Sequence, residues 1–276
     1  MPDAPVLSPR RTAYLRSRHR RRTAVRTVQI LLLLAFLILW EVAARLGWVD
    51  TFIVSSPCRV AVKLAQLYRD GDLWLHVGTS CWETVIGFTL GTVLGTLAAV
   101  ALWWSDFVSR VLDPYLVVLN ALPKTALGPI FIVWMGAGTG AIITMTLAIS
   151  IIVTILNMHV GFLSTDPRKI QLMRTLGATR RQIFTMLVFP ANYATLFNTL
   201  KVNVGLSWVG VIMGEFLVSK AGLGYLIVYG SQVFDMDLVM ATVLLLAIAA
   251  VLMYQAILWL EKLLKKCLGL SGAESR

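Results

Sequence analysis

Side chains that carry out chemistry are scarce in this sequence, and their scarcity excludes several functions. The 276 residues include only 3 His, 3 Cys and 14 Asp or Glu, against 25 Lys or Arg. The cysteines lie far apart, at Cys58, Cys81 and Cys267, so their spacing fits neither a disulfide framework nor a metal site. The phosphate-binding pattern Gly-x-x-x-x-Gly-Lys-Ser/Thr is also missing. We therefore expect no metal and no cofactor, and we expect any ATP to be handled by another chain.

Apolar residues, in contrast, are abundant. They make up 58% of the chain, charged residues make up 14%, and the mean hydropathy is +0.77. A bilayer core of about 30 Å needs roughly 20 apolar residues per helix. Six segments are long enough: Val28–Leu46, Thr84–Trp104, Tyr115–Trp134, Ala141–Phe162, Ala194–Phe216 and Leu238–Leu260. We therefore predict an all-α membrane domain of six transmembrane helices over residues 28–265.

The positive charges predict the orientation in the membrane. Arginines crowd the first 26 residues, where Asp3 is the only acid. We interpret residues 1–27 as a basic cytoplasmic tail in contact with anionic lipid, in preference to a nucleic-acid-binding segment. The apolar run after this tail continues through Trp40, which favours an uncleaved anchor over a signal peptide. Six spans return residues 266–276 to the cytoplasm as a second tail.

Two local patterns concern the outer side and the second span. Pro57 suits the first turn of a helix and Gly71 its end, which predicts an amphipathic helix on the outer surface. In the second span, Gly87, Gly91 and Gly95 recur every fourth residue. This spacing predicts close approach of another helix, either from the same chain or from a second copy.

The third span is the least regular and is one candidate for a translocation pathway. It carries Asn120, Pro123, Lys124 and Pro129 within an apolar run. Irregular backbone in a membrane is tolerated where it lines a cavity or is covered by protein. Lys124 lies nine residues into the predicted span, where a charge costs about 2.5–3.5 kcal/mol, so it either faces an anionic solute or reaches toward an interface.

The fifth span contributes further candidates for the pathway. Asn203 and Ser207 form a polar stripe that either faces a pathway or holds helices together. Glu215 is the only acid of that span and is a candidate to line the outer mouth or to pair with Lys220. His76, before the second span, is interpreted as an interfacial residue. Asp235 and Asp237, before the last span, are interpreted as solvated.

A basic loop, residues 165–190, separates the fourth and fifth spans. Thr165 or Asp166 is placed to cap a short helix that Gly177 would end. Thr179 is placed to cap a second short helix. The loop carries an apolar stripe formed by Ile170, Leu172, Met173 and Leu176. It also carries five cations, namely Arg168, Lys169, Arg174, Arg180 and Arg181. A rigid, charged knob of this kind on the cytoplasmic face suits docking to a soluble partner.

The loop also has a distinctive spacing. Gln171-Leu172-Met173 is followed by Gly177 and later by Leu187-Val188-Phe189-Pro190. This spacing resembles the "EAA…G…I-LP" loop of bacterial ABC-importer permeases, the coupling helix that fits a groove on the ATP-binding subunit. Gly177 and Pro190 match that motif. The triplet at 171–173 stands where the family has Glu-Ala-Ala, so the contact made by the family's Glu is not carried over.

The resemblance extends over residues 28–265. Blocks 55–88, 112–138 and 206–227 are similar, in the same order, to the nitrate/sulfonate/taurine/bicarbonate branch of these permeases. Glu83 stands where that branch commonly has Arg. The resemblance implies a type I importer-like permease in the bacterial inner membrane, with cytoplasmic ATPase subunits, an extracytoplasmic solute-binding protein and a homodimeric state. Its coupling residues would be Arg168, Gln171, Leu172, Met173, Arg174, Gly177, Ala178 and Pro190.

Two other classes of function stay open at this point. A membrane enzyme would need converging acids, His or Cys, but His19, His76 and His159 belong to distant segments. An ion-driven carrier would be expected to show internal repeats and buried acids, and neither is evident in the sequence. The solute is a small anion in the branch resembled, whereas related permeases move thiamine precursors, riboflavin or aromatic acids.

Overall fold

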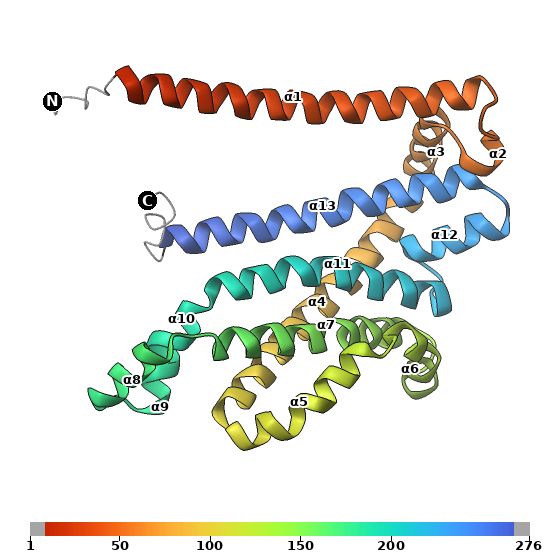
Figure 1. The fold of residues 1–276 in the computed structure, drawn as a ribbon. Helices are drawn as coiled ribbons and strands as arrows, with labels where there is room; N and C mark the ends of the chain where they lie inside the picture. The colour runs from red at the N-terminus through yellow and green to blue at the C-terminus, as the bar shows by residue number, and fades with distance from the viewer. Residues whose placement is uncertain (1–8, 268–276) are drawn as a thin grey trace.

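The computed structural model describes residues 9–267, which form helices joined by short turns (Figure 1). The longer helices are α1 Pro9–Arg45, α3 Pro57–Asp70, α4 Asp72–Trp104, α5 Asp106–Ala121, α7 Thr139–Leu163, α11 Tyr193–Val218, α12 Leu223–Gln232 and α13 Met236–Cys267. The shorter elements are α2 Thr51–Val54, the 3-10 turn η1 Lys124–Leu127, α6 Gly128–Met135, α8 Pro167–Thr175, α9 Arg180–Ile183, the π-helical segment η2 Phe184–Val188 and α10 Phe189–Ala191.

Five of these helices are long and apolar enough to cross a membrane. They are the Thr23–Arg45 part of α1, and α4, α7, α11 and α13. A sixth candidate is the pair made of α5 and the η1–α6 segment, which is long and apolar enough only when taken together and is bent by 86° at the break. The prediction of six spans is therefore confirmed when this bent pair counts as one.

The predicted limits of the third span were wrong. Its helix begins at Asp106 rather than Tyr115, and it ends at Ala121 rather than continuing to Trp134. Pro123 lacks a backbone donor and disfavours a helical conformation for the residue before it, and Leu122 is accordingly extended, with φ −65° and ψ 135°. Lys124 thus follows the end of a helix instead of lying in the middle of one.

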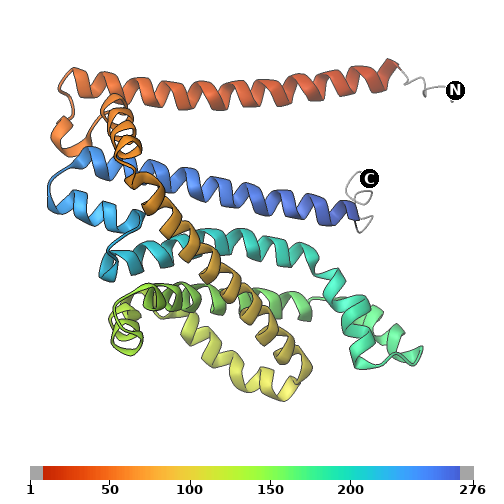
Figure 2. The same ribbon diagram turned by 180° about the vertical axis from the view of Figure 1, so that it is seen from behind.

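The helix ends separate into two sides of the molecule. The N-terminal end of α1 and the C-terminal end of α13 lie on the same side as α8 and α9, while α3, α6 and α12 lie on the opposite side (Figures 1 and 2). The described ends of the chain and the 165–190 loop therefore share one side, and the assignment of this side to the cytoplasm stays a prediction. The α5–α6 break, with Lys124, lies toward the side of α6 and α12 (Figure 1).

The centre of the fold is α7, packed between α4 and α11. The three glycines of α4 make one of these contacts possible. A Cβ added at Gly87 would lie 2.5 Å from Thr146, one at Gly91 would lie 1.9 Å from Ser150, and one at Gly95 would lie 2.6 Å from Thr154. The glycine stripe therefore packs against a helix of the same chain, which settles the alternative left open by the sequence.

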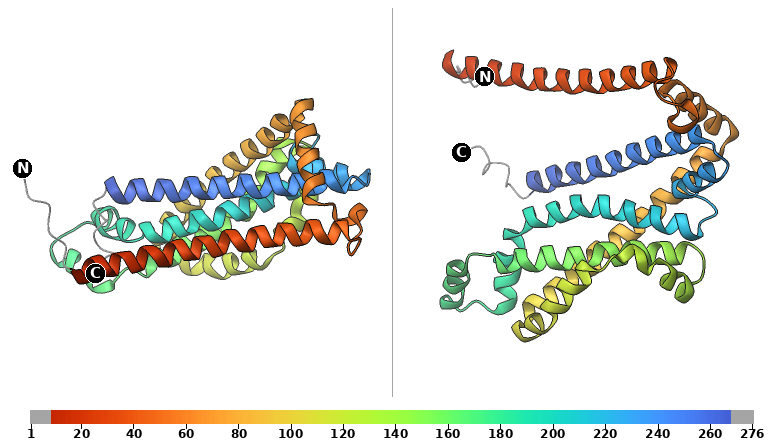
Figure 3. Two further views of the ribbon diagram at one scale, coloured as in Figure 1. Left: turned by 90° about the horizontal axis from the view of Figure 1, so that it is seen from above. Right: turned by 45° about the vertical axis from the view of Figure 1, so that its right-hand side comes forward.

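The first transmembrane helix lies apart from this centre. Only 6% of the most apolar stretch of α1 is buried against the rest of the chain, and the main contacts of α1 are with α3 (Figure 3, right). The predicted helix between Pro57 and Gly71 is confirmed: α3 starts at Pro57 and ends at Asp70, and Gly71, whose φ of 84° is left-handed, caps its end. α3 packs against α13 and so connects the first helix to the rest of the fold.

Candidate functional site

The loop at residues 165–190 folds as its capping residues predict. The Asp166 carboxylate accepts a hydrogen bond from the Arg168 backbone N–H at 2.9 Å and so caps α8. Gly177 has a φ of 81° and ends this helical turn. Thr179 caps α9 in a reciprocal capping box with Gln182, whose side-chain oxygen accepts from the Thr179 backbone N–H at 2.8 Å.

The predicted apolar stripe of α8 proves to be two separate faces. Ile170 and Met173 are half-buried and pack against the cluster that includes Phe162, Phe184 and Val188. Leu172 and Leu176, in contrast, are 60% and 77% exposed. The expectation that all four residues form one stripe was therefore wrong. Two of them fix the loop to the helix bundle, and two present apolar surface outward.

The remaining predicted coupling residues divide between these two faces. Arg168, Gln171, Arg174 and Gly177 are exposed, and Ala178 is half-buried beside the cluster under the loop. The outward face of α8 thus combines two leucines with cationic and amide side chains.

Arg180 anchors the second half of the loop, which the sequence did not predict. Its guanidinium donates to the Trp103 carbonyl oxygen at 2.9 Å and lies 5.3 Å from the centroid of the Trp103 ring. It also lies 3.7 Å from the Asp106 carboxylate. Trp103 in turn contacts Phe184, with 5.0 Å between ring centroids. The turn between α4 and α5 therefore supports the loop.

The two ends of the loop are joined at its base. The Asn192 side-chain amide donates to the Thr165 hydroxyl at 3.0 Å and to the Val188 carbonyl oxygen at 2.8 Å. Pro190 lies in the short α10, directly after the π-helical segment η2, and half-buried. The chain changes direction here and enters α11. A closed base of this kind allows the loop to move as one body with α7 and α11.

The predicted pathway residues do not lie together. Lys124 and Asn120 are neighbours at the α5–η1 break, where the Lys124 ammonium donates to the Asn120 carbonyl oxygen at 3.0 Å. Asn203 and Ser207 are 0% exposed within the chain. The Asn203 amide donates to Thr154 at 2.7 Å and to Thr92 at 3.1 Å. These contacts favour the interpretation that this stripe of α11 holds helices together.

Glu215 also lies in the interior. It is 1% exposed, its two oxygens accept from the Ser80 hydroxyl and the Gly224 backbone N–H, and no ion pair with Lys220 occurs among the described residues. The expected positions at the outer mouth or beside Lys220 were therefore wrong. The cause is the turn after α11, which folds back and covers this carboxylate.

His76 belongs to the same enclosed network. It is 8% exposed, its Nδ1 accepts from the Gly222 backbone N–H at 3.0 Å, and its ring stacks on Tyr225. The interpretation of His76 as an interfacial residue was wrong, because the Gly222 turn covers it as well. The contacts of His76 with Gly222 and of Ser80 with Glu215 have no local sequence signal, because each joins segments more than a hundred residues apart.

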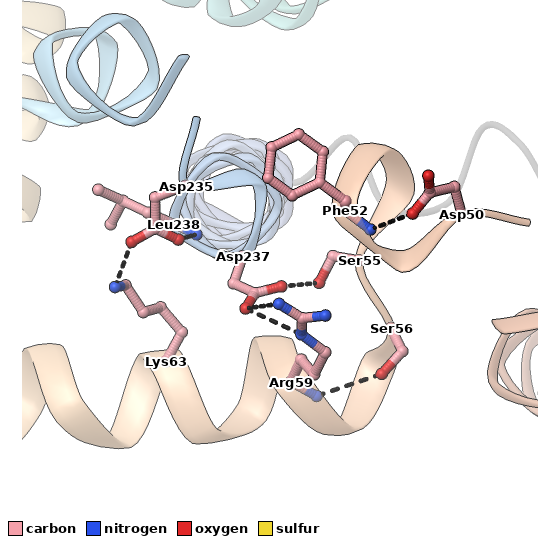
Figure 4. Close-up of polar contacts among 9 residues, drawn as sticks. All are labelled: Asp50, Phe52, Ser55, Ser56, Arg59, Lys63, Asp235, Asp237 and Leu238. Carbon is pink, nitrogen blue, oxygen red and sulfur yellow. Dashed lines mark hydrogen bonds and ion pairs between the residues drawn. The ribbon is translucent and has the colours of Figure 1, made fainter. Parts of the chain in front are cut away.

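On the side of the molecule opposite the 165–190 loop, charged residues of α3 hold the start of α13 (Figure 4). Asp237 accepts from the Ser55 hydroxyl at 2.6 Å and pairs with Arg59 at 2.8 Å, and Asp235 pairs with Lys63. The expectation that both aspartates are solvated was wrong. Burial alone would raise the pKa of Asp235, but the hydrogen bonds from Lys63 and the Leu238 backbone and the nearby cations lower it below its ordinary value.

A polar pocket lies between α7 and α11 near the base of the loop. Its volume is about 440 Å³. Its lining includes three hydroxyl groups and two amides, those of Ser164, Thr195, Thr199, Asn157 and Asn198. No group of three or more His, Cys, Asp or Glu side chains in the described part of the chain is arranged to hold a metal ion. The three hydroxyl groups donate to other groups of the chain, to the carbonyl oxygens of Gly161 and Thr195 and to the side-chain oxygen of Asn192.

Comparison with known protein families identifies the class. Residues 91–268, more than half of the chain, match the family described as binding-protein-dependent transport system inner membrane component. The chain belongs to this family. The match begins at Gly91 within α4 and includes the 165–190 loop and both helices that flank it. This permease is therefore a multi-pass component of the inner membrane.

Individual relatives have several different solutes in their names. The chain is similar to the formylaminopyrimidine transport permease protein ThiX of Halalkalibacterium halodurans, with 29% identity over 85% of this chain and 93% of the relative. It is also similar to the taurine transport system permease protein TauC of Escherichia coli, with 25% identity over 82% of this chain and 84% of the relative. A third is the Escherichia coli aliphatic sulfonates permease SsuC, with 26% identity over 76% and 80%.

The fold is also found among solved structures. An inward-facing structure of the MetNI methionine ABC transporter matches 68% of this chain and 93% of its own chain, with a TM-score of 0.60 and 20% identity. The prediction of an ABC importer permease fold is confirmed by this likeness and by the family. Helices α1 to α3 and the first part of α4 lie before the family match.

Proposed function

We propose that this permease forms the translocation pathway of an ATP-driven importer for a small anion such as a sulfonate, taurine, nitrate or bicarbonate. It acts as a homodimer, receives its solute from an extracytoplasmic binding protein and binds a cytoplasmic ATPase through the 165–190 loop. The observation that carries the proposal is the outward face of α8, where Leu172 and Leu176 are exposed on a loop fixed at its base. ATP hydrolysis takes place on the partner, and this chain transmits the movement.

The structure of the loop supports such transmission. Ile170 and Met173 hold α8 on the cluster under it, Arg180 holds the second half on the α4–α5 turn, and Asn192 closes the base. A push on the exposed leucines therefore reaches α7 and α11 without first deforming the loop. These two helices line the polar pocket, so the same movement alters the inner side of the pathway.

Cysteine crosslinking in native membranes tests the docking surface. In a chain whose own cysteines are replaced by Ser, Leu176→Cys is expected to crosslink to a nucleotide-binding subunit. Met186→Cys is the matched control, because Met186 is 69% exposed but lies in η2, in the second half of the loop, whereas Leu176 is the C-cap of α8. Equal crosslinking at both positions, or none at Leu176→Cys while the ATPase is present, would contradict the proposed surface.

The anion is supported by the relatives named for sulfonates and taurine and by Lys124 at the outer break of the third span. A second candidate is a neutral heterocycle, since other relatives are named for formylaminopyrimidine and riboflavin. Uptake of labelled taurine, an alkanesulfonate, riboflavin and the pyrimidine should be compared in cells with and without the gene. Loss of taurine or sulfonate uptake is expected, and selective loss of riboflavin or pyrimidine uptake would replace the anion with the heterocycle.

A further inference from the structure

Two carboxyl groups meet in the interior of the outer half of the bundle. Glu83 on α4 and Glu215 on α11 are each 1% exposed, and Ser80, one helical turn before Glu83, donates its hydroxyl hydrogen to Glu215, so the same face of α4 carries both groups to one place. They are far apart in the sequence, and each lies on a membrane-spanning helix. Two neighbouring ionised carboxylates repel each other strongly when water is excluded, so the pair needs a proton or a cation.

Neighbouring groups supply no positive charge. Among the described residues, no Lys or Arg forms an ion pair with either carboxylate. The titratable neighbours are His76 and Cys81 on α4 and Tyr225 on α12. His76 is neutral, because its Nδ1 accepts a hydrogen bond from the Gly222 backbone N–H and so carries no proton itself.

The polarity of the hydrogen bonds indicates where the proton lies. The Gly224 backbone N–H donates to one oxygen of Glu215 at 2.5 Å, and the Ser80 hydroxyl donates to the other at 2.5 Å. Ser80 already accepts from the Leu223 backbone N–H at 2.7 Å, so its own proton is directed to Glu215. Glu215 is therefore the acceptor on both oxygens, which is the pattern of an ionised carboxylate.

Glu83 has the complementary pattern. Its Oε2 is buried and has no hydrogen-bond partner among the described residues. A buried, ionised carboxylate with an empty oxygen is costly, whereas a neutral carboxyl group that donates its proton to Glu215 leaves only one weak acceptor unused. We propose that Glu83 and Glu215 share one proton, carried by Glu83, and that this proton holds the turn at residues 219–224 against α4.

The proton has a structural consequence for the outer side of the permease. The turn that Glu215 and Ser80 hold connects α11 to α12, and α12 leads into α13. Ionisation of Glu83 places a second negative charge beside Glu215 and weakens the attachment of this turn to α4. The outer ends of α11 and α12 thereby become sensitive to the pH of the medium through a site separate from the ATPase-binding loop.

Purified protein in detergent is sufficient for the test, so transport and the identity of the solute do not enter. Above about pH 4.3, where an exposed glutamate ionises, unfolding releases the shared proton. The unfolding equilibrium of the wild type is then expected to shift about tenfold per pH unit toward the unfolded state, until Glu83 itself ionises. Glu83→Gln retains a donor for Glu215 and is expected to remove this dependence.

Three comparisons make the result decisive. Glu41→Gln is the matched control, because Glu41 lies on another membrane helix and is paired with Arg45, and it should keep the wild-type pH dependence. Glu215→Gln places an amide opposite two donors and should melt at a lower temperature than Glu83→Gln. The infrared band of a protonated carboxyl group, present in the wild type near neutral pH, should vanish in Glu83→Gln.

Contrary results are equally clear. An unchanged pH dependence or an unchanged carboxyl band in Glu83→Gln would overturn the proposal. Better tolerance of Glu215→Gln than of Glu83→Gln would contradict the assignment of the proton to Glu83. A melting temperature that follows sodium concentration at fixed pH in the wild type, but not in Glu83→Gln, would replace the proton with a bound cation.

Discussion

Gly91→Ala is the substitution that most directly examines the packing at the centre of the fold. The new Cβ would lie 1.9 Å from the Ser150 Oγ and 3.0 Å from its Cβ, whereas ordinary contact begins at 3.4 Å. Rotation of the Ser150 side chain relieves the first contact but not the second, so α4 and α7 must also separate. Overpacking of this kind costs about 1–3 kcal/mol. For a chain of this size the melting temperature should fall by roughly 2–12 °C.

A matched control exists on a neighbouring helix. A Cβ added at Gly205 in α11 would have no atom within 4 Å, so Gly205→Ala should cause no loss and could gain up to about 1 kcal/mol from helix propensity. Ser150→Ala in the Gly91→Ala background removes the nearer contact and should recover part of the loss. Both melting temperatures are measured on purified protein in one detergent. Equal stability of Gly91→Ala and Gly205→Ala would refute the close contact between α4 and α7.

Three further predictions concern the loop and the outer ion pairs. Thr179→Ala removes the capping box of α9, worth about 1 kcal/mol, and trypsin cleavage after Arg180 should become about fivefold faster; an unchanged rate would show that the cap does not hold the loop. The pKa of Asp235 is lowered in the folded protein, so its pairing with Lys63 stabilises the fold above about pH 3.8 and is lost as the pH falls below that value. Asp235→Asn should therefore abolish the loss of stability that the wild type shows below this pH. A wild-type acid profile in the variant would contradict this. Gln171→Glu restores the acid that the family motif has at this position, so ATPase binding should be at least as strong as in the wild type, and weaker binding would count against the motif alignment.

The local structure of the loop was predictable because its signals are local. Asp166, Gly177 and Thr179 act on backbone groups within three residues of themselves, and their chemistry is visible in the sequence. The division of the apolar stripe was not predictable in the same way. Whether Leu172 faces inward or outward depends on Phe162 and Phe184, which reach the loop only through the fold.

The candidate pathway residues show more clearly which contacts cannot be predicted from the sequence. Helical spacing groups Asn203 with Ser207, but it does not identify Thr92 and Thr154 as the partners of Asn203. Hydropathy placed Lys124 at mid-span, because it averages over the break that Pro123 introduces. Glu215 is a single acid near a helix end in the sequence, and only the returning turn makes it a buried group.

Affinity purification of the tagged permease in mild detergent, with mass spectrometry of what accompanies it, tests the central claim most directly. The account predicts a cytoplasmic ATPase in stoichiometric amount with the wild type, and its loss when Leu172 and Leu176 are both replaced by Glu. The Met186→Glu control should retain it. A permease that is purified without any ATPase from membranes containing one, or that retains the ATPase in the double variant, would contradict docking through α8.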